Sequence, residues 1–176
     1  MSYLFLDTET TGLEAGIDEI TEIAWIARLN DGREFTAQYF VEHSRLPNEW
    51  VLKNTDYMNR IALAEKYPLR EVLRFLSGVV ELNDAPMHMV GACPAFDDRF
   101  LRAAFAAHKR EVPYHYHVID IEAMAFGALG LPTMPPLKEL RSKLGIPGEN
   151  EAAHTALADA REAMLIFDAI RARATH

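Results

Sequence analysis

The chain has 176 residues, of which 49% are hydrophobic and 25% are charged, and its formal net charge is −8 at pH 7. This length and composition are typical of one globular domain, here residues 1–176, and exclude a low-complexity or repeat protein. The negative charge argues against a protein that coats nucleic acid through bulk positive charge, but it leaves enzymes that act on nucleic acid open.

The ends of the chain and its cysteine content give further limits. The N-terminus has no basic region and reaches carboxylates after a short apolar run, so we expect neither a signal peptide nor a membrane span. A cytoplasmic location is therefore expected. The lone Cys93 excludes an internal disulfide and a cysteine zinc cluster, so any bound metal must be held by oxygen.

The first predicted strand, residues 3–6, runs directly into two acidic residues, Asp7 and Glu9. Because side chains alternate along a strand, both carboxylates project from the same side. Two like charges about 4 Å apart repel by roughly 4 kcal/mol at an effective dielectric near 20, and a divalent cation relieves this repulsion. The turn that follows, Thr10-Thr11-Gly12, offers amides and hydroxyls suited to a phosphate or a sugar. An ordinary acidic turn is the alternative.

The next segments predict an antiparallel meander. Residues 19–29 and 33–41 have the β-branched and aromatic content of strands, and Asn30-Asp31-Gly32 between them is a hairpin turn. We expect Trp25 and Trp50 to pack in the core or on its flank rather than to stack on bases.

The middle of the chain alternates between irregular and regular segments. Residues 43–67 predict short helices and loops, with a helix starting at Asn48. The apolar spacing in residues 69–80 predicts a helix, and residues 87–91 predict a short strand.

A turn from strand to helix within residues 91–101 carries two more acidic residues. On a helical wheel Asp97 falls among small and apolar residues and faces inward, whereas Asp98 lies beside Arg102. Helix capping is the alternative explanation for Asp97. One face of this helix is predicted to carry Arg99, Arg102, Lys109 and Arg110. A solvated surface explains this basic face, with phosphate binding as the alternative.

The last third predicts one strand and three helices. The strand is residues 114–119, and Asp120 is expected to cap a helix over residues 121–129, with contact to a metal as the alternative. A short helix over residues 137–144 is closed by Gly145. The final helix is predicted from near Glu151 to about Arg171.

A third acidic residue lies in the apolar stripe of that final helix. Asp159 falls near Ala156, Ala163 and Ile166, so it is aimed at the core. His154 precedes it by five residues, near the start of the helix. A histidine there is usually solvated, and its interest comes from its position relative to Asp159.

Taken together, the three acidic stretches resemble the DEDDh family of 3′-to-5′ exonucleases, which includes the proofreading subunit of bacterial replicative polymerase and ribonuclease T. Residues 7–12 look like the first motif of the family, Phe96-Asp97 with Phe100-Leu101 like the second, and His154 with Asp159 like the third. The resemblance covers nearly the whole chain. It implies a ribonuclease-H-like α/β fold, with a mixed five-stranded sheet whose second strand is antiparallel and with helices on both faces.

The resemblance also implies a mechanism. The residues that would hold two Mg²⁺ ions, which Mn²⁺ should replace, are Asp7, Glu9, Asp97 and Asp159. His154 would be the general base, and Thr10, Thr11 and Leu13 would line the pocket for the terminal nucleotide. The expected partner is the 3′ end of a single-stranded nucleic acid, with DNA slightly favoured over RNA, and the products are nucleoside 5′-monophosphates.

The sequence departs from the family pattern at one position and differs from some relatives at another. Cys93 stands where relatives often carry Asn in H-N-x-x-F-D, which predicts a changed preference rather than lost chemistry. Thr10 stands where oligoribonucleases typically carry Met, which argues against a scavenger of RNA dinucleotides. The other readings are a binding module without activity and an endonuclease that cuts within RNA·DNA hybrids. A homodimer or an association with a polymerase is left open.

Overall fold

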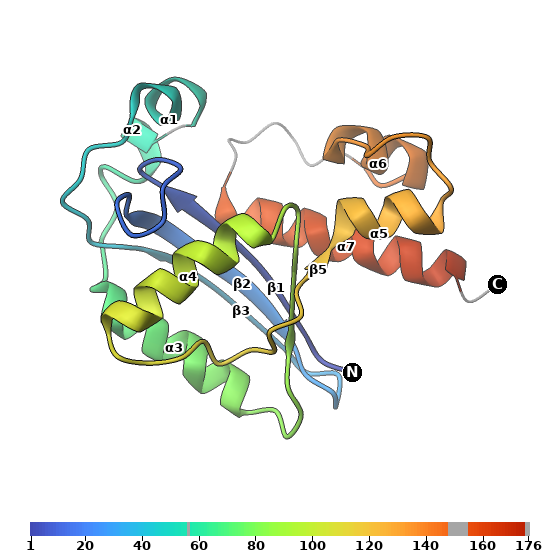
Figure 1. Cartoon of the computed structure of the whole chain (residues 1–176), viewed down its shortest axis with the longest axis horizontal. Helices are drawn as coiled ribbons and strands as arrows, with labels where there is room; N and C mark the ends of the chain where they lie inside the picture. Colours follow the sequence, from blue (N-terminus) through green and yellow to red (C-terminus); the bar gives the residue numbers. More distant parts are fainter. Residues whose placement is uncertain (56, 148–154, 175–176) are drawn as a thin grey trace.

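The computed structural model describes residues 1–55, 57–147 and 155–174, which form one five-stranded sheet with helices packed against it. Figure 1 shows this arrangement. The strands are β1 (Tyr3–Thr10), β2 (Ile20–Arg28), β3 (Glu34–Phe40), β4 (His88–Gly91) and β5 (Ile119–Asp120). Their order in the sheet is β3-β2-β1-β4-β5. β2 is antiparallel to both β1 and β3, whereas β4 and β5 run parallel to β1, so the predicted mixed sheet is confirmed.

Seven helices of the described residues lie between β3 and β4, between β4 and β5, or after β5. They are α1 (Glu49–Asn54), α2 (Tyr57–Arg60), α3 (Leu69–Glu81), α4 (Ala95–Ala107), α5 (Ile121–Ala128), α6 (Leu137–Leu144) and α7 (Ala156–Ala174). No helix among the described residues is both long enough and apolar enough to span a membrane.

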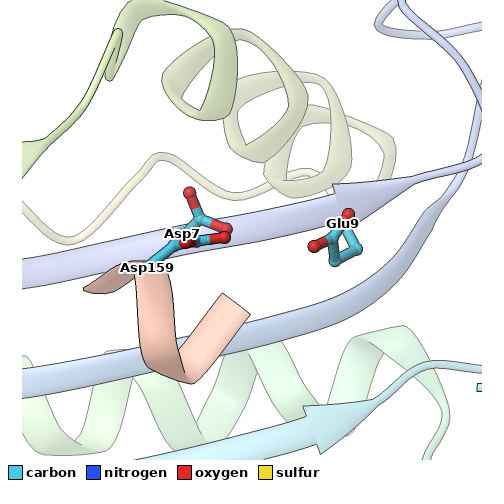
Figure 2. A group of neighbouring side chains, drawn as sticks. All are labelled: Asp7, Glu9 and Asp159. Atoms are coloured by element: carbon cyan, nitrogen blue, oxygen red, sulfur yellow. The ribbon is translucent and has the colours of Figure 1, made fainter. Parts of the chain in front are cut away.

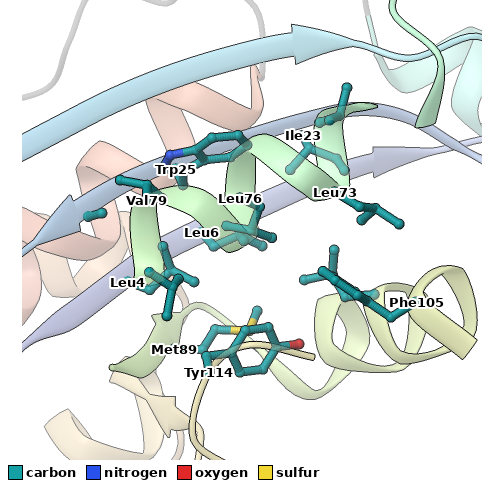
Figure 3. Packing of buried hydrophobic residues seen from close by; sticks show 14 of the residues in the cluster. Leu4, Leu6, Ile23, Trp25, Leu73, Leu76, Val79, Met89, Phe105 and Tyr114 are labelled. Carbon is teal, nitrogen blue, oxygen red and sulfur yellow. The ribbon is translucent and has the colours of Figure 1, made fainter. Parts of the chain in front are cut away.

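The alternation of side chains along β1 assigns its residues to two different hydrophobic cores. Leu4 and Leu6 pack in the first cluster, with α3 and α4, and Figure 3 shows part of this packing. Tyr3 and Phe5 pack in the second cluster, with α5, α6 and α7. The sheet therefore has helices on both faces, as expected. Continuing the alternation, the odd-numbered acidic residues of β1 lie on the α7 side.

Most of the predicted elements are present, but the predicted strand over residues 114–119 is largely wrong. Only Ile119 and Asp120 form a strand, which pairs with Val90 and Gly91 of β4. The preceding residues do not continue this pairing, because the backbone N–H of His115 instead donates to the carbonyl of Met87 at 2.8 Å. Asp120 does cap α5, since its Oδ1 accepts from the N–H groups of Glu122 and Ala123.

Three smaller expectations are also corrected. Trp25 is buried as predicted, but the side chain of Trp50 is 63% exposed, because it lies on the outer face of the short helix α1. α4 ends at Ala107 and Lys109 has a left-handed φ of 55°, so Lys109 and Arg110 lie beyond the helix rather than on its face. α7 begins at Ala156 rather than near Glu151, since Thr155 is not helical and its Oγ1 accepts from the N–H of Ala158 at 3.0 Å.

Candidate active site

Three carboxylates from two distant segments meet at the end of β1. Asp7, Glu9 and Asp159 each offer an oxygen atom, and these atoms all lie within 4.8 Å of one another. Figure 2 shows Asp7 and Glu9 on β1 and Asp159 on the first turns of α7, which crosses beside the strand. The predicted convergence of these three residues is therefore present in the structure.

Packing between α7 and β1 holds this geometry. The ring of Phe167 lies edge-on to the rings of Tyr3 and Phe5, with centroids 4.7 Å and 5.5 Å apart. The adjacent residue of the helix, Asp168, accepts two hydrogen bonds from Arg28 of β2, at 2.7 and 2.9 Å. These contacts fix the rotation of α7, so the Asp159 side chain faces the sheet.

Asp97 approaches the same strand from the opposite face. It lies in the first turn of α4, is 3% exposed, and is outside the group of three carboxylates. Its Oδ1 accepts hydrogen bonds from the N–H of Thr8 at 2.9 Å and from the Thr8 hydroxyl at 2.6 Å. Asp97 therefore faces inward as predicted, and its partner belongs to the first acidic motif. It remains close enough to raise the pKa of Asp7 through its charge.

Burial and mutual repulsion raise the pKa of these acidic groups. Burial is the largest cause for Asp7, followed by the charges of Asp97 and Asp159, and its pKa is well above the usual value. Burial, followed by the charges of Glu22 and Asp159, raises the pKa of Glu9 to about 8. Burial raises the pKa of Asp97 to about 7, although its hydrogen bonds from Thr8 act in the opposite direction. Each group is thus poised to exchange a proton for a cation.

Sequence reasoning missed a buried ion pair beside this group. Glu22 of β2 lies directly across from Glu9 in the sheet and is fully buried. Its carboxylate accepts from Arg60 of α2 at 2.7 Å and from Gln38 of β3 at 2.6 Å. The available signal was an acidic residue in the middle of an otherwise apolar strand. The position of Arg60 had no such signal, because it depends on how residues 43–67 fold back over the sheet.

The turn after β1 is held by hydrogen bonds to Asp18. The Asp18 carboxylate accepts from the N–H of Glu14 at 2.9 Å, from the hydroxyl of Thr11 at 3.4 Å and from Arg45 at 2.9 Å. A Cβ atom at Gly12 would lie closer than 3.0 Å to this carboxylate, so a larger residue would force the Asp18 side chain to move.

The residues expected to bind the terminal nucleotide differ in exposure. Thr10 and Thr11 are buried, and the Thr10 hydroxyl donates to the carbonyl of Gly12 at 2.6 Å. The side chain of Leu13 is 67% exposed. Leu13 is therefore accessible to a ligand, whereas the two threonines support the turn beneath it.

Of two further positions in the motifs, the structure describes Cys93 but not His154. Cys93 is exposed at the turn between β4 and α4, with a left-handed φ of 51°. His154 lies outside the described residues, so its expected role as a base stays a prediction.

Comparison with models of protein families identifies the family of this chain. A family model described as an exonuclease, RNase_T, matches residues 4–167. The chain belongs to this exonuclease family. The resemblance to DEDDh-type 3′-to-5′ exonucleases, inferred from the three motifs, is thereby confirmed. No curated protein matches this exonuclease chain significantly.

Solved structures of exonuclease I have the same fold as this exonuclease chain. A product-bound structure of exonuclease I has a TM-score of 0.74 at 19% identity, and the match covers 99% of this chain and 44% of that one. Exonuclease I of E. coli in complex with a dT13 oligonucleotide has a TM-score of 0.72 at 21% identity, covering 98% and 41%. The chain thus spans less than half the length of the exonuclease I chains that it matches. At these identities the likeness shows the fold, and the ribonuclease-H-like architecture is confirmed.

The donor set of the exonuclease site suits a divalent cation. In the described part of the chain, no lysine or arginine forms an ion pair with Asp7 or Glu9. Partly buried carboxylates without such a partner, here Asp7 and Glu9, are costly unless they are protonated or bind a cation. Because all their ligand atoms are oxygen, they suit hard ions such as Mg²⁺ and Mn²⁺.

Proposed function

We propose that residues 1–176 form a single exonuclease domain that hydrolyses phosphodiester bonds from the 3′ end of single-stranded nucleic acid in a metal-dependent reaction. The observation that carries this proposal is the convergence of Asp7, Glu9 and Asp159 at the end of β1. Membership of the exonuclease family supports it. DNA is slightly favoured over RNA, and the cytoplasmic location expected from the sequence remains part of the proposal.

The proposed cofactor is a pair of Mg²⁺ ions, with Mn²⁺ as a substitute. Asp7, Glu9 and Asp159 would hold one ion, and Asp97 would contribute to the second through Oδ2, which accepts no hydrogen bond from the described residues. When bound, such a pair neutralises the phosphoryl oxygens and stabilises the leaving 3′ oxygen. Asp97 is oriented for this role by Thr8, which occupies its other oxygen.

The proposed general base is His154, which directly precedes the Thr155 cap of α7. Asp159, a proposed metal ligand, lies in the first turn of α7 and follows His154 by five residues in the sequence. A neutral imidazole in this place would take the proton of the attacking water. The products would be nucleoside 5′-monophosphates.

The proposed pocket for the last nucleotide lies at the turn after β1. Leu13 is exposed and would contact the terminal base, while Thr10 and Thr11 would line the pocket from below by supporting the turn. Single-stranded ends are favoured because a paired end would first have to be opened to reach a partly buried site. A solved exonuclease I binds the oligonucleotide dT13, and this supports the choice of DNA for the related chain.

The experiment is digestion of a 5′-labelled single-stranded DNA oligonucleotide, with RNA of the same sequence and a mismatched duplex in parallel. A ladder that shortens from the 3′ end in Mg²⁺ and stops in EDTA is the expected result. His154→Ala should retain cation binding and lose at least roughly a hundredfold in rate, since general-base catalysis contributes about 10² or more. His108→Ala is the matched control, because His108 is exposed at the far end of α4.

The products distinguish this proposal from the other readings of the sequence. Internal fragments would indicate an endonuclease, and binding without any cleavage would indicate a module that lacks activity. Either result would overturn the proposed function.

A further inference from the structure

A groove of about 730 Å³ lies beside α4, away from the carboxylate cluster. One wall is α4 itself, through Arg102 and Ala106, and the other is the segment that follows α4, residues 110–116. In Figure 1 this segment passes from the end of α4 beneath the helix toward β5. The carboxylates of the candidate active site do not line the groove, so it is a separate surface.

The groove and the neighbouring face of α4 carry positive charge that the described residues only partly neutralise. Arg102 pairs with Asp98 at 2.7 Å. Arg110 donates to the Ser77 hydroxyl at 3.2 Å and lies over the ring of Phe105, but forms no ion pair among the described residues. Arg99 likewise forms no ion pair with the residues that the structure describes. It donates to a backbone carbonyl at 3.3 Å and lies over an aromatic ring. Such a patch can attract an anionic ligand even in a chain whose net charge is −8.

Aromatic side chains stand at the same groove. Tyr116 lines it and is 69% exposed. Its ring stacks on that of His115, with centroids 4.4 Å apart and an interplanar angle of 29°. Glu111 is the acidic residue among those lining the groove. An exposed, supported aromatic ring beside Arg110, which has no ion pair among the described residues, is a combination that binds the bases and phosphates of single strands.

The position of α4 connects this groove with the active site. Asp97 lies in the first turn of α4, and the exposed residues Arg99, Arg102 and Ala106 follow at helical spacing. With a rise of 1.5 Å per residue, the path from Asp97 to Ala106 is about 14 Å along the helix axis. A stacked strand advances about 3.4 Å per nucleotide, so roughly four nucleotides cover this distance.

We propose that this groove and the exposed face of α4 bind the upstream part of the single strand whose 3′ end is in the active site. Arg99, Arg102 and Arg110 contact its phosphates, and Tyr116 stacks on a base. This inference rests on the proposed function, because it takes the same strand as the occupant. The sequence favoured a solvated surface as the explanation of these basic residues. The inference instead assigns them a role in binding.

The experiment measures binding of a dodecathymidylate whose 3′ linkages are phosphorothioate, by fluorescence anisotropy at several salt concentrations. Arg110→Gln and Tyr116→Ala should each raise the Kd of the dodecamer roughly five- to tenfold. Arg110→Gln should also lower the slope of log Kd against log salt by about 0.7, as expected for one lost phosphate contact on a single strand. The Kd of a trinucleotide should change much less, because it does not reach the groove.

Two control variants separate charge from folding. Arg110→Lys keeps the charge and should retain most of the affinity, and melting curves check that each variant is folded. Arg74→Gln removes an exposed arginine from α3 that does not line the groove, and it should bind like the unmodified protein.

The inference is overturned if the dodecamer does not bind, or if Arg110→Gln and Tyr116→Ala bind it with unchanged affinity and salt slope. It is also overturned if an acidic peptide, polyglutamate, binds the groove more tightly than the dodecamer. If an unmodified dodecamer binds but is not cut, the proposed function fails, while the variants still decide whether the groove binds the strand.

Discussion

Burial and four neighbouring carboxylates raise the pKa of Asp7, a residue that has no ion-pair partner among the described cations. A carboxylate in this situation destabilises the fold in its charged form, because the folded state holds it away from water and close to like charges. Selection for stability would not place it there. Its surroundings are those of a residue whose partner is a bound cation.

Replacing Asp7 by Asn tests this interpretation at a single residue. We expect turnover to fall at least roughly a thousandfold. The metal-free protein should be as stable as the unmodified one or more stable, because the change removes like-charge repulsion. Thermal melts in EDTA measure this, with a rise of roughly 2–4 °C for each kcal/mol gained. Asp84→Asn, an exposed loop position, is the control, and a clear drop in the melting temperature of Asp7→Asn would contradict the account.

The buried pair of Glu22 and Arg60 gives the opposite prediction. Arg60→Met leaves a fully buried carboxylate without its cation, which should cost about 3–5 kcal/mol of unfolding free energy. Arg60→Met combined with Glu22→Leu should recover most of this loss, as measured by urea denaturation in EDTA. Arg33→Met breaks an exposed pair with Asp31 and should cost less than about 1 kcal/mol. An equal loss in the Arg60 and Arg33 variants would refute the idea of an essential buried pair.

At the scale of elements, the sequence patterns predicted the helices and strands whose own residues show which face is buried. The spacing in α3 and the alternation in β1 and β2 identified these elements, because each has one face or both faces in a core. Residues 114–118 alternate like a strand, yet they do not pair with β4. Pairing depends on a partner elsewhere in the chain, so a local pattern cannot predict it.

The same distinction applies to the candidate site. Strand alternation and helical spacing predicted which way Asp7, Glu9 and Asp159 face, and the resemblance to the exonuclease family implied that they converge. These patterns did not predict that Asp97 approaches from the other face of the sheet, with Thr8 as its partner. Glu22 became part of the site through its register with Glu9, and Arg60 through the fold of residues 43–67.

The turn after β1 leads to a prediction at the element scale. Gly12→Ala would push a methyl group into the Asp18 carboxylate, which would have to move and give up its hydrogen bonds to the turn that carries Leu13. We expect KM for a single-stranded oligonucleotide to rise more than kcat falls, together with a loss of about 1–3 kcal/mol in stability. Gly78→Ala is the matched control, because Gly78 is an exposed position of α3 with open space around it and should gain about 0.5–1 kcal/mol. Wild-type KM in Gly12→Ala would argue against a role for this turn in substrate binding.

For the molecule as a whole, the carboxylate cluster couples stability to pH. The folded-state pKa values of Glu9 and Asp97 are about 8 and about 7, above the value of roughly 4 expected in the unfolded chain. The folded state therefore holds more protons than the unfolded state between these limits, so stability falls as pH rises through this range. A bound cation replaces the protons and removes the penalty.

Melting temperatures from pH 5 to pH 9 test this coupling. In EDTA the melting temperature should fall as pH rises toward 8, and saturating Mg²⁺ should reduce or reverse the fall. Asp7→Asn should show a shallower decline, whereas Asp84→Asn should follow the unmodified protein because it removes one exposed charge only. A melting temperature that rises with pH in EDTA would show that these carboxylates do not repel one another.

Anomalous diffraction from a crystal soaked in Mn²⁺ tests the central claim most directly, because it locates the bound cations. We predict a peak coordinated by Asp7, Glu9 and Asp159, and a second one about 3.5–4 Å away that Asp97 can reach. Both peaks should disappear in Asp7→Asn crystals soaked in the same way. Finding no peak within reach of Asp7 at saturating Mn²⁺ would contradict the claim that these carboxylates form a metal-dependent nuclease site.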